Sequence, residues 1–409
     1  MDFDLPGDDD PRRLAVREWL AAHPSPGPAE LHAAGYVVPH WPPPFGLDAD
    51  PIQQLLIDEE LRRGGVTRSA SAVNAIGVGW AAPTIYLAGS DWQKQRFLDP
   101  IFRAEEIWCQ LFSEPDAGSD LAALATRAER DGDEYVITGS KIWSSGAHLA
   151  KFGILIARTD PDAPKHKGLS YFILPMDLPG VTLQPIIDMT TAHSFNQTFF
   201  DNVRLPVGYR VGAEGDGWRL AKVTLANERV SLSSGGSLWG SGPSAGDLLD
   251  MVRAGGGLTD PLLRQAAARL HVEAEVLRLG RLRTLSARLH GRTPGPEASV
   301  QKIMGDEHGQ HVMELAKQLA GTAGMLTGSG PAGTLDGRAR IGPTENNVAG
   351  DFACVDPMWH YGYLFAPALT IGGGTFAVQR NIVAEQVLGL PREPDVERGM
   401  TWRQTRSRD

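Results

Sequence analysis

Two short segments, about twenty residues apart, carry side chains that could bind a flat ring and a phosphate. The first reads Cys-Gln-Leu-Phe-Ser-Glu-Pro-Asp-Ala-Gly-Ser-Asp over 109–120, and the second reads Ile-Thr-Gly-Ser-Lys-Ile-Trp-Ser-Ser over 137–145. In the first, a polar loop after an apolar run, Gly118 adds no bulk and allows unusual φ values. In the second, which we expect to be a strand, Trp143 and Ser145 are two residues apart and so share a face.

Hydroxyl groups next to an indole suit an isoalloxazine ring, because the hydroxyls can hydrogen-bond its edge while the indole covers its face. Alone, the first segment is better explained as an ordinary Asx or Ser turn, and the second as a strand with a core tryptophan. Together, in this order and spacing, they are a more specific indication of a flavin site.

Both segments resemble signatures of the acyl-CoA dehydrogenase family of flavoproteins. The first is similar to Thr/Ser-Glu-Pro-x-Ala-Gly-Ser-Asp, and the second to Gly-x-Lys-x-Trp-Ile/Thr-Ser/Thr. The likeness continues at 89–100, 201–206 and 379–392, and so covers nearly the whole chain. It implies an N-terminal helical domain, a middle β-barrel domain and a C-terminal four-helix bundle, with flavin at their junction. It also implies a homodimer or homotetramer whose subunits complete one another's flavin sites.

The hydrophobic pattern by itself predicts an α+β chain of helices, then a small antiparallel β domain, then helices again. We place the domains at 1–110, 111–217 and 218–409. Helices are expected over 12–22, 52–63, 70–87, 92–98, 219–231, 260–289, 298–320 and 376–388. Strands are expected over 135–138, 152–157, 169–174 and 181–184. Linkers are expected over 235–246 and 255–257, and a long Gly- and Pro-rich loop over 327–351.

The resemblance assigns the cofactor FAD and nine residues that bind it. Ser119 is expected at the pyrophosphate or ribityl region, where it also borders the substrate. The family's Arg-x-x-Phe-Gly turn is weakened here, since 253–257 reads Arg-Ala-Gly-Gly-Gly; Arg264 is a candidate substitute. Both Arg264 and Gln318 could equally be ordinary helix-surface residues. The nine residues are Gln110, Phe112, Ser113, Gly118, Ser119, Trp143, Ser145, Gln318 and Thr375.

Removing a proton from an alkyl α-carbon requires a general base and a group that stabilises the enolate. Many family members supply the base as Glu-Gly-Thr, but this chain has Gly373 in place of that Glu. A second base location in the family, as in isovaleryl-CoA dehydrogenase, is on the helix after the β domain, just before an Arg. By resemblance, Glu228 occupies that position here. We predict Glu228 as the base, with Arg229 orienting it or the substrate, and the Gly373 backbone N–H as oxyanion donor. Glu228 could alternatively serve only in a cap or salt bridge.

The implied reaction converts an acyl-CoA to its trans-2-enoyl-CoA and passes electrons to an electron-transfer flavoprotein. The Gly-rich wall at 372–374 favours branched or bulky acyl groups, steroid side chains included. An acyl-carrier-protein thioester is an alternative to the CoA thioester as substrate. One alternative is a non-catalytic or half-site subunit of a heterotetramer. Another is a flavin oxidase or monooxygenase of the same fold.

Composition limits other functions. The chain has 409 residues, 42% hydrophobic content and a formal net charge of −10, which argues against nonspecific nucleic-acid binding. It has no apolar run long enough for a membrane span and no signal-peptide pattern. With two cysteines and no metal-ligand spacing, we expect a cytoplasmic protein without a metal site. Cys109 is expected to be a packed thiol and His148 to face a turn or solvent. His193 is expected to be an ordinary residue, with a place at a CoA or substrate entrance as the alternative.

Overall fold

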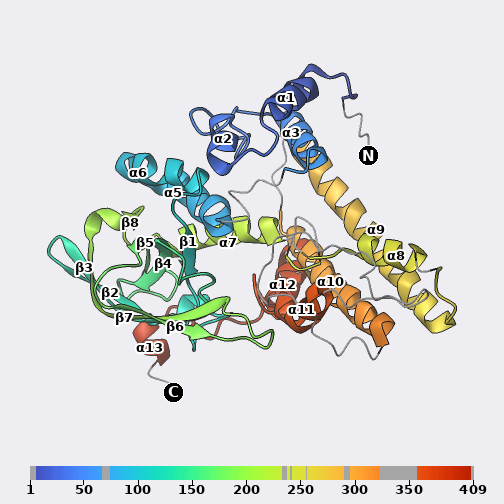
Figure 1. The fold of residues 1–409 in the computed structure, drawn as a ribbon. Coiled ribbons are helices and arrows are strands. Elements are labelled where there is room, and N and C mark those ends of the chain that lie inside the picture. Colours follow the sequence, from blue (N-terminus) through green and yellow to red (C-terminus); the bar gives the residue numbers. More distant parts are fainter. Residues whose placement is uncertain are drawn as a thin grey trace. The chain divides into compact units, whose positions relative to one another are not determined.

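The computed structural model describes residues 6–66, 74–232, 237–239, 242–254, 256–289, 295–321 and 357–406. The chain forms two compact units (Figure 1). The sheet unit consists of residues 2–186, 193–227 and 394–409, and the bundle unit consists chiefly of 187–192 and 228–393. The division falls inside one helix, α7 (Gly217–Leu232).

Helices form the N-terminal part of the sheet unit, and side-chain caps fix where several of them begin. Asp50 and Ser90 each accept a hydrogen bond from the backbone N–H three residues on, which satisfies a donor that the first helical turn leaves free. The helices that the sequence predicts in this part are confirmed wherever the structure describes them, except that a π turn, η1, interrupts the one expected over 70–87. The helical segments are α1 (Pro11–Ala22), α2 (Pro28–Ala33), α3 (Pro51–Arg63), η1 (Gly77–Ala81), α5 (Ala82–Ala88) and α6 (Asp91–Phe102).

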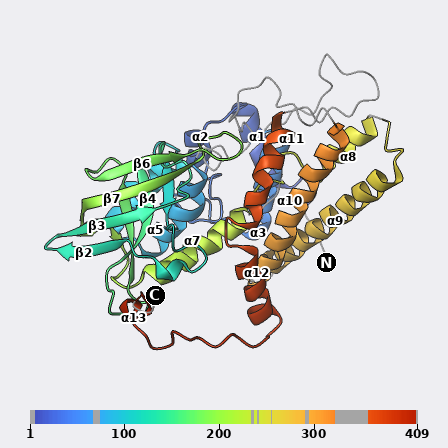
Figure 2. The same cartoon turned by 90° about the horizontal axis from the view of Figure 1, so that it is seen from below.

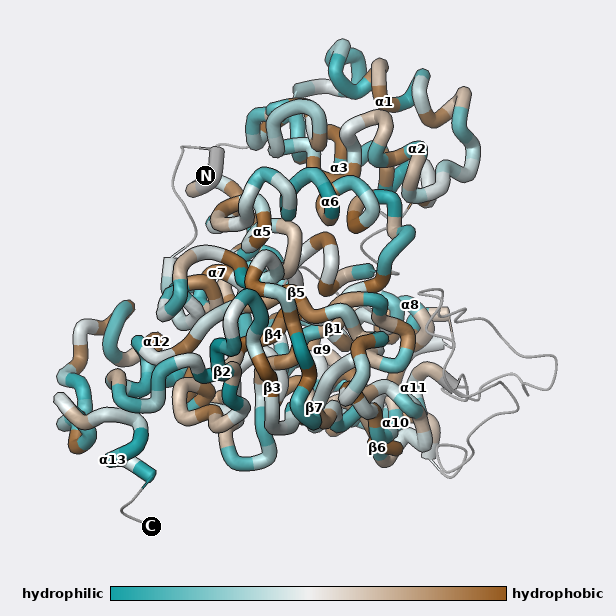
Figure 3. The backbone as a smooth tube through the Cα atoms, turned by 90° about the vertical axis from the view of Figure 1, so that its left-hand side faces the viewer, coloured by the Kyte–Doolittle hydropathy of each residue, from teal (hydrophilic) through white to brown (hydrophobic). Residues whose placement is uncertain are grey.

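The described strands of this unit form one eight-stranded sheet in the order β6-β7-β3-β2-β4-β5-β8, with β1 pairing β4. β4 is buried along its whole length and β5 along nearly all of it, and Figure 3 shows apolar stretches in both. The strands are β1 (Trp108–Leu111), β2 (Arg127–Asp131), β3 (Glu134–Lys141), β4 (Phe152–Arg158), β5 (Leu169–Pro175), β6 (Val181–Ile186), β7 (Phe195–Pro206) and β8 (Arg210–Val211). Two short turns accompany them, η2 (Leu121–Ala123) and η3 (Val207–Tyr209).

The four strands predicted from the sequence are confirmed, but the sheet differs from expectation in three ways. It is mixed, because β1 and β2 both pair with β4 in parallel. The sequence pattern missed β1, β2, β8 and β7, the last of which pairs with both β3 and β6. β3 also ends at Lys141, so Trp143 and Ser145 lie beyond the strand and the two-residue alternation does not apply to them. The pairing of β3 with β7 shifts register between Ile137 and Gly139 and continues to Lys141, and the backbone then turns left-handed at Trp143 (φ 61°).

The bundle unit is helical, and its buried apolar residues form a core between α8, α9, α10 and α11. Figure 2 shows α9 and α10 running side by side. All helices predicted here are confirmed, except that the expected 376–388 helix ends in a π turn, η6. The segments are α8 (Ala245–Ala254), α9 (Pro261–Leu289), α10 (Ala298–Ala320), α11 (Pro357–Phe365), η5 (Ala366–Thr370), α12 (Phe376–Ile382) and η6 (Val383–Val387), while α13 (Trp402–Arg406) belongs to the sheet unit.

α8 corrects one expectation, since its first residues fall within the predicted linker 235–246. The signal was in the sequence: Ser244 and Asp247 exchange hydrogen bonds as a reciprocal cap, a pattern that marks a helix start. The expected loop over 327–351 and Cys354 lie outside the described residues. None of the described helices is both long and apolar enough to cross a bilayer.

Candidate active site

A buried ion pair joins the two signature segments. Lys141 Nζ lies 2.8 Å from Glu114 Oε1 and also donates to the Phe112 carbonyl at 2.9 Å. The Lys141 side chain is 0% exposed and that of Glu114 is 8% exposed. Burial alone would raise the pKa of Glu114, but the charge and hydrogen bond of Lys141 lower it overall. Burial lowers the pKa of Lys141. Sequence reasoning missed this pair, although both residues stand inside the quoted motifs.

Backbone bonds complete the joint between the segments. Glu114 and Ala117 exchange two backbone hydrogen bonds of 3.1 Å, which close a tight turn, and the Ile142 N–H donates to the Ser113 carbonyl at 2.9 Å. Ser113 is therefore held beside the residue that precedes Trp143. Gly139 is required by space and conformation, because its φ is 148° and a Cβ there would lie 2.5 Å from Thr126 Oγ1.

The structure brings the residues predicted from the two signature segments into the sheet unit. Trp143 is 55% exposed in a left-handed conformation, an unusual place for a large aromatic side chain. Ser113, Ser145 and Gln110 are half-buried. Phe112, by contrast, packs its ring edge-on against Tyr171 in the core, so only its backbone could face a ligand.

Gly118 and Ser119 are exposed in the turn that follows, and a Cβ on Gly118 would meet nothing within 4 Å. An exposed indole, two hydroxyls, an amide and an open turn are a donor set that fits a planar polar ring with a phosphate tail. These residues of the chain therefore fit the flavin that the resemblance implies.

Just after the second signature segment, the imidazole rings of His148 and His193 stack on each other, with ring centroids 4.1 Å apart. Asn196 holds both, since its amide nitrogen lies 3.2 Å from His148 Nδ1 and its amide oxygen lies 2.8 Å from His193 Nε2. The same amide nitrogen donates to the Ser144 carbonyl at 3.1 Å. Burial and the nearby charge of His193 lower the pKa of His148. No local pattern indicates this pairing, because it depends on the position of β7.

Glu228 lies on α7 and is 7% exposed. One turn earlier, the Thr224 hydroxyl forms hydrogen bonds with those of Thr84 at 2.8 Å and Tyr171 at 3.0 Å, which fixes the preceding turn of the helix. The next residue, Arg229, is helical, but its side chain lies outside the described part of the structure.

The glycine turn before α12 has a constrained backbone. Gly373 and Gly374 have φ values of 63° and 90°, which L side chains rarely adopt. Gln379 is buried, and its amide nitrogen donates to the Gly373 carbonyl at 3.2 Å and to the Gly374 carbonyl at 3.4 Å. Its amide oxygen is buried with no hydrogen-bond partner among the described residues. The Thr375 hydroxyl caps α12 by accepting from the Val378 N–H.

The remaining predicted cofactor residues stand on helix surfaces of the bundle unit. Gln318 is exposed in the last turn of α10, and Arg264 is exposed in the first turn of α9. Arg253 pairs with Asp250 at 2.5 Å within α8. The turn partners at 255 and 322–324 lie outside the described residues.

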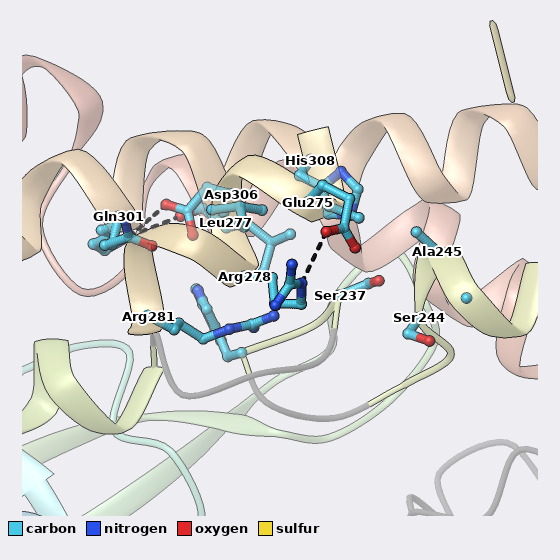
Figure 4. A pocket seen from close by; sticks show the side chains of 16 residues that line it. Ser237, Ser244, Ala245, Glu275, Leu277, Arg278, Arg281, Gln301, Asp306 and His308 are labelled. Atoms are coloured by element: carbon cyan, nitrogen blue, oxygen red, sulfur yellow. Dashed lines mark hydrogen bonds and ion pairs between the residues drawn. The ribbon is translucent and has the colours of Figure 1, made fainter. Parts of the chain in front are cut away.

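A separate pocket of about 240 Å³ opens between α8, α9 and α10 (Figure 4). Lys302 and Asp306 form a buried pair on its wall, and burial raises the pKa of Asp306 to about 6. On the α9 side, Arg278 lies 2.8 Å from Glu275. None of the residues that the sequence singled out lines this pocket.

Comparison with known proteins supports the family assignment along the chain. Models of the acyl-CoA dehydrogenase N-terminal, middle and C-terminal domains match residues 13–105, 109–203 and 215–388. The chain is 38% identical over 378 residues to acyl-CoA dehydrogenase FadE34 of Mycobacterium tuberculosis, covering 92% of this chain and 48% of that protein. It thus spans about half the length of FadE34. It is 36% identical over 364 residues to acyl-CoA dehydrogenase IpdE1 of the same organism, covering 89% and 87% of the two chains.

Solved structures show the same fold. A structure described as the Tcur3481-Tcur3483 steroid ACAD has a TM-score of 0.73 and 28% identity, covering 96% of this chain and 100% of that one. The ChsE4-ChsE5 complex from Mycobacterium tuberculosis has a TM-score of 0.73 and 29% identity, with the same coverage. Because the three domain models match in order and the relatives align over most of its length, the chain belongs to the acyl-CoA dehydrogenase family.

Proposed function

We propose that this chain catalyses the FAD-dependent α,β-dehydrogenation of an acyl-CoA thioester to the trans-2-enoyl thioester and passes the electrons to an electron-transfer flavoprotein. The observation that carries the proposal is the joined pair of signature segments. The Glu114–Lys141 pair and the bond from Ile142 to Ser113 hold an exposed indole and hydroxyl groups in a rigid setting. Ser113, Trp143 and Ser145 would hold the ring, and the turn at Gly118 and Ser119 would hold the phosphates.

In this proposal Glu228 takes the α-proton, and FAD held by Ser113, Trp143 and Ser145 would supply the acceptor for the hydride of the β-carbon. Burial at Glu228 favours a base shielded from water, which an acid as weak as an α-C–H requires. The Gly373 backbone N–H donates to the thioester oxygen, and the Gln379 side chain keeps that turn in its left-handed conformation by holding two of its carbonyls.

The substrate that we propose is an acyl-CoA with a bulky or branched acyl group, such as a steroid side chain. Three consecutive glycines at 372–374 place no side chain of their own beside the substrate. A relative in structure, the Tcur3481-Tcur3483 protein, is described as a steroid ACAD. That description supports the substrate class without naming the acyl chain.

A half-site subunit in a heteromer is the second candidate. Two specific observations favour it. Structural relatives are complexes of two different proteins. The segment 253–257, which corresponds to the family's Arg-x-x-Phe-Gly turn toward the partner subunit, lacks the Phe, and its Arg253 pairs with Asp250. A homodimer or homotetramer with complete sites is our first expectation. Light scattering, together with activity measured with and without a co-expressed neighbouring protein, separates the two.

The test is the visible spectrum of the purified protein, the mass of the flavin released on denaturation, and anaerobic bleaching of that flavin by acyl-CoA thioesters. We expect stoichiometric FAD. Glu228→Gln should keep FAD but slow bleaching by at least roughly 10²-fold, the lower range for general base catalysis. Glu314→Gln, an exposed carboxylate on α10, is the control and should bleach like the parent. Parent protein without FAD would overturn the flavin assignment, and unchanged bleaching in Glu228→Gln would overturn the base.

A further inference from the structure

The C-terminal tail lies far from the flavin signature in sequence but within the same compact unit. Its last described helix, α13, lies beside the sheet of that unit in both Figure 1 and Figure 2. The backbone N–H groups of Trp402 and Arg403 donate to the carbonyls of Ala163 and Pro161 at 2.9 and 3.0 Å. Arg403 also pairs with Asp162 at 2.9 Å. The tail is therefore attached to the β4–β5 connection at several points.

Beneath the tail, Arg158 at the end of β4 is a buried cation, only 3% exposed. Its guanidinium forms no ion pair with a described carboxylate and donates instead to three carbonyls. Two of these belong to the turn after the signature, Ala122 at 2.7 Å and Leu124 at 3.1 Å, and the third is Lys165 at 3.3 Å. Burial lowers the pKa of Arg158 to about 10. Glu114 and Asp160 attract this charge without forming an ion pair with it, so burial of the guanidinium still needs compensation from direct contacts.

Trp402 supplies that compensation. The Arg158 guanidinium carbon lies 4.4 Å from the centroid of the Trp402 ring, within the range of a cation–π contact. The Trp402 indole N–H donates to the Ala123 carbonyl at 3.1 Å. Arg158 and Trp402 together thus hold the three successive carbonyls of residues 122–124.

A second contact reaches the signature itself. Lys165 Nζ lies 2.9 Å from Asp120 Oδ2 and 2.6 Å from Glu397 Oε2. Burial lowers the pKa of Lys165, but its hydrogen bonds to Glu397 and Asp120 raise it overall, so Lys165 is charged at neutral pH. The tail is therefore linked to residues 120–124 at two points. Glu397 reaches Asp120 through Lys165, and Trp402 holds the Ala123 carbonyl directly while it stacks on Arg158.

We propose that the C-terminal segment 397–403 is a strap that orders the turn at Gly118–Asp120, and that Trp402 is a positioning residue for the pyrophosphate of FAD. This inference rests on the proposed function, because it concerns how the same flavin site is held. Without the strap the backbone N–H groups of the turn are free to move, and the phosphate must order them when it binds. The strap therefore raises the affinity for FAD and leaves the chemistry at the ring unchanged.

The experiment compares apoprotein of the full chain with Trp402→Ala and Trp402→Phe. Trp402→Ala loses one cation–π contact and one hydrogen bond, and should bind FAD at least roughly tenfold more weakly. Trp402→Phe keeps an aromatic face over Arg158 and should lie between this variant and the parent. Saturating FAD should restore the turnover rate of Trp402→Ala. Arg398→Ala, an exposed change on the same tail, is the control and should match the parent.

A second readout does not depend on flavin. In the apoprotein, amide hydrogen exchange over 119–125 should be faster in Trp402→Ala than in the parent, while exchange in β4 and β5 stays the same. An FAD affinity within twofold of the parent, or unchanged exchange over 119–125, would overturn the strap. A parent that binds no FAD would instead refute the proposed function, and the exchange data would still decide whether the tail orders this turn.

Discussion

The Glu114–Lys141 pair permits a quantitative prediction through Lys141→Met, which keeps the length of the side chain and removes its charge. Removing one partner of a buried ion pair costs about 3–5 kcal/mol, because the other charge is left buried. The Phe112 carbonyl also loses its donor, which adds about 1 kcal/mol. Glu114 keeps two backbone donors, Ala125 at 2.7 Å and Thr126 at 2.9 Å, which reduces the loss. We therefore expect about 3 kcal/mol of destabilisation in the sheet unit.

The chain has two units, so a single unfolding transition cannot be assumed. Hydrogen exchange at the amides of β3 and β7 measures the stability of the sheet unit directly. Lys151→Met is the matched control, because Lys151 also lies 2.8 Å from a glutamate, Glu106, but is 57% exposed. Exposed ion pairs contribute about 0–1 kcal/mol, so the control should change little.

The double variant Lys141→Met/Glu114→Gln tests the cause. If the loss arises from a buried, unpaired carboxylate, neutralising Glu114 should recover part of it, with a coupling of about 1–3 kcal/mol. A loss below about 1 kcal/mol in Lys141→Met, or strict additivity in the double variant, would refute the reasoning that charge burial governs this joint.

Two further predictions follow from the same regions. Gln379→Leu removes both side-chain donors to the glycine turn, and should slow anaerobic flavin bleaching about tenfold or more while FAD content stays constant; bleaching at the parent rate would show that the turn holds its conformation unaided. Lys141 lowers the pKa of Glu114 in the folded protein below its ordinary value of 4.5. The pair therefore stabilises the fold above pH 4.5, and this stabilisation is lost as the pH falls through the folded-state pKa of Glu114. Sheet-unit exchange measured from pH 6 to 3 should show this loss in the parent and a weaker one in Lys141→Met/Glu114→Gln; identical pH dependence would contradict it.

The sequence predicted most helices correctly because their signals are local. α3 begins after a capping Asp50 and keeps an apolar stripe through Leu61, and both features are visible in the short stretch 50–61. The two signature segments could also be recognised from the sequence, because each is a contiguous run of residues. β7 was missed because two of its buried positions carry the polar residues Asn196 and Thr198, which breaks the apolar alternation, and because its pairing with β3 and β6 is a property of the folded sheet.

The features that complete the candidate site depend on contacts across long stretches of sequence. Lys141 meets Glu114 only because β3 returns past the first segment, and His148 meets His193 only because β7 places Asn196 where its amide bonds both rings. Trp402 reaches Arg158 across more than half of the chain. Periodicity and propensity contain no information about such pairs, because each residue has an ordinary local explanation.

The glycine turn shows how the structure changes the meaning of a correct sequence observation. From the sequence, Gly373 is a position where a catalytic glutamate is absent. In the structure its φ of 63° and the 90° of Gly374 give the glycines a conformational role as well. A glutamate at 373 would adopt a left-handed backbone at roughly 1–2 kcal/mol, and a Cβ on Gly374 would lie 2.5 Å from the Gln379 amide nitrogen. The location of the base and the conformation of this turn are therefore coupled. If Glu228 is the base, position 373 needs no carboxylate, and the left-handed backbone there favours glycine.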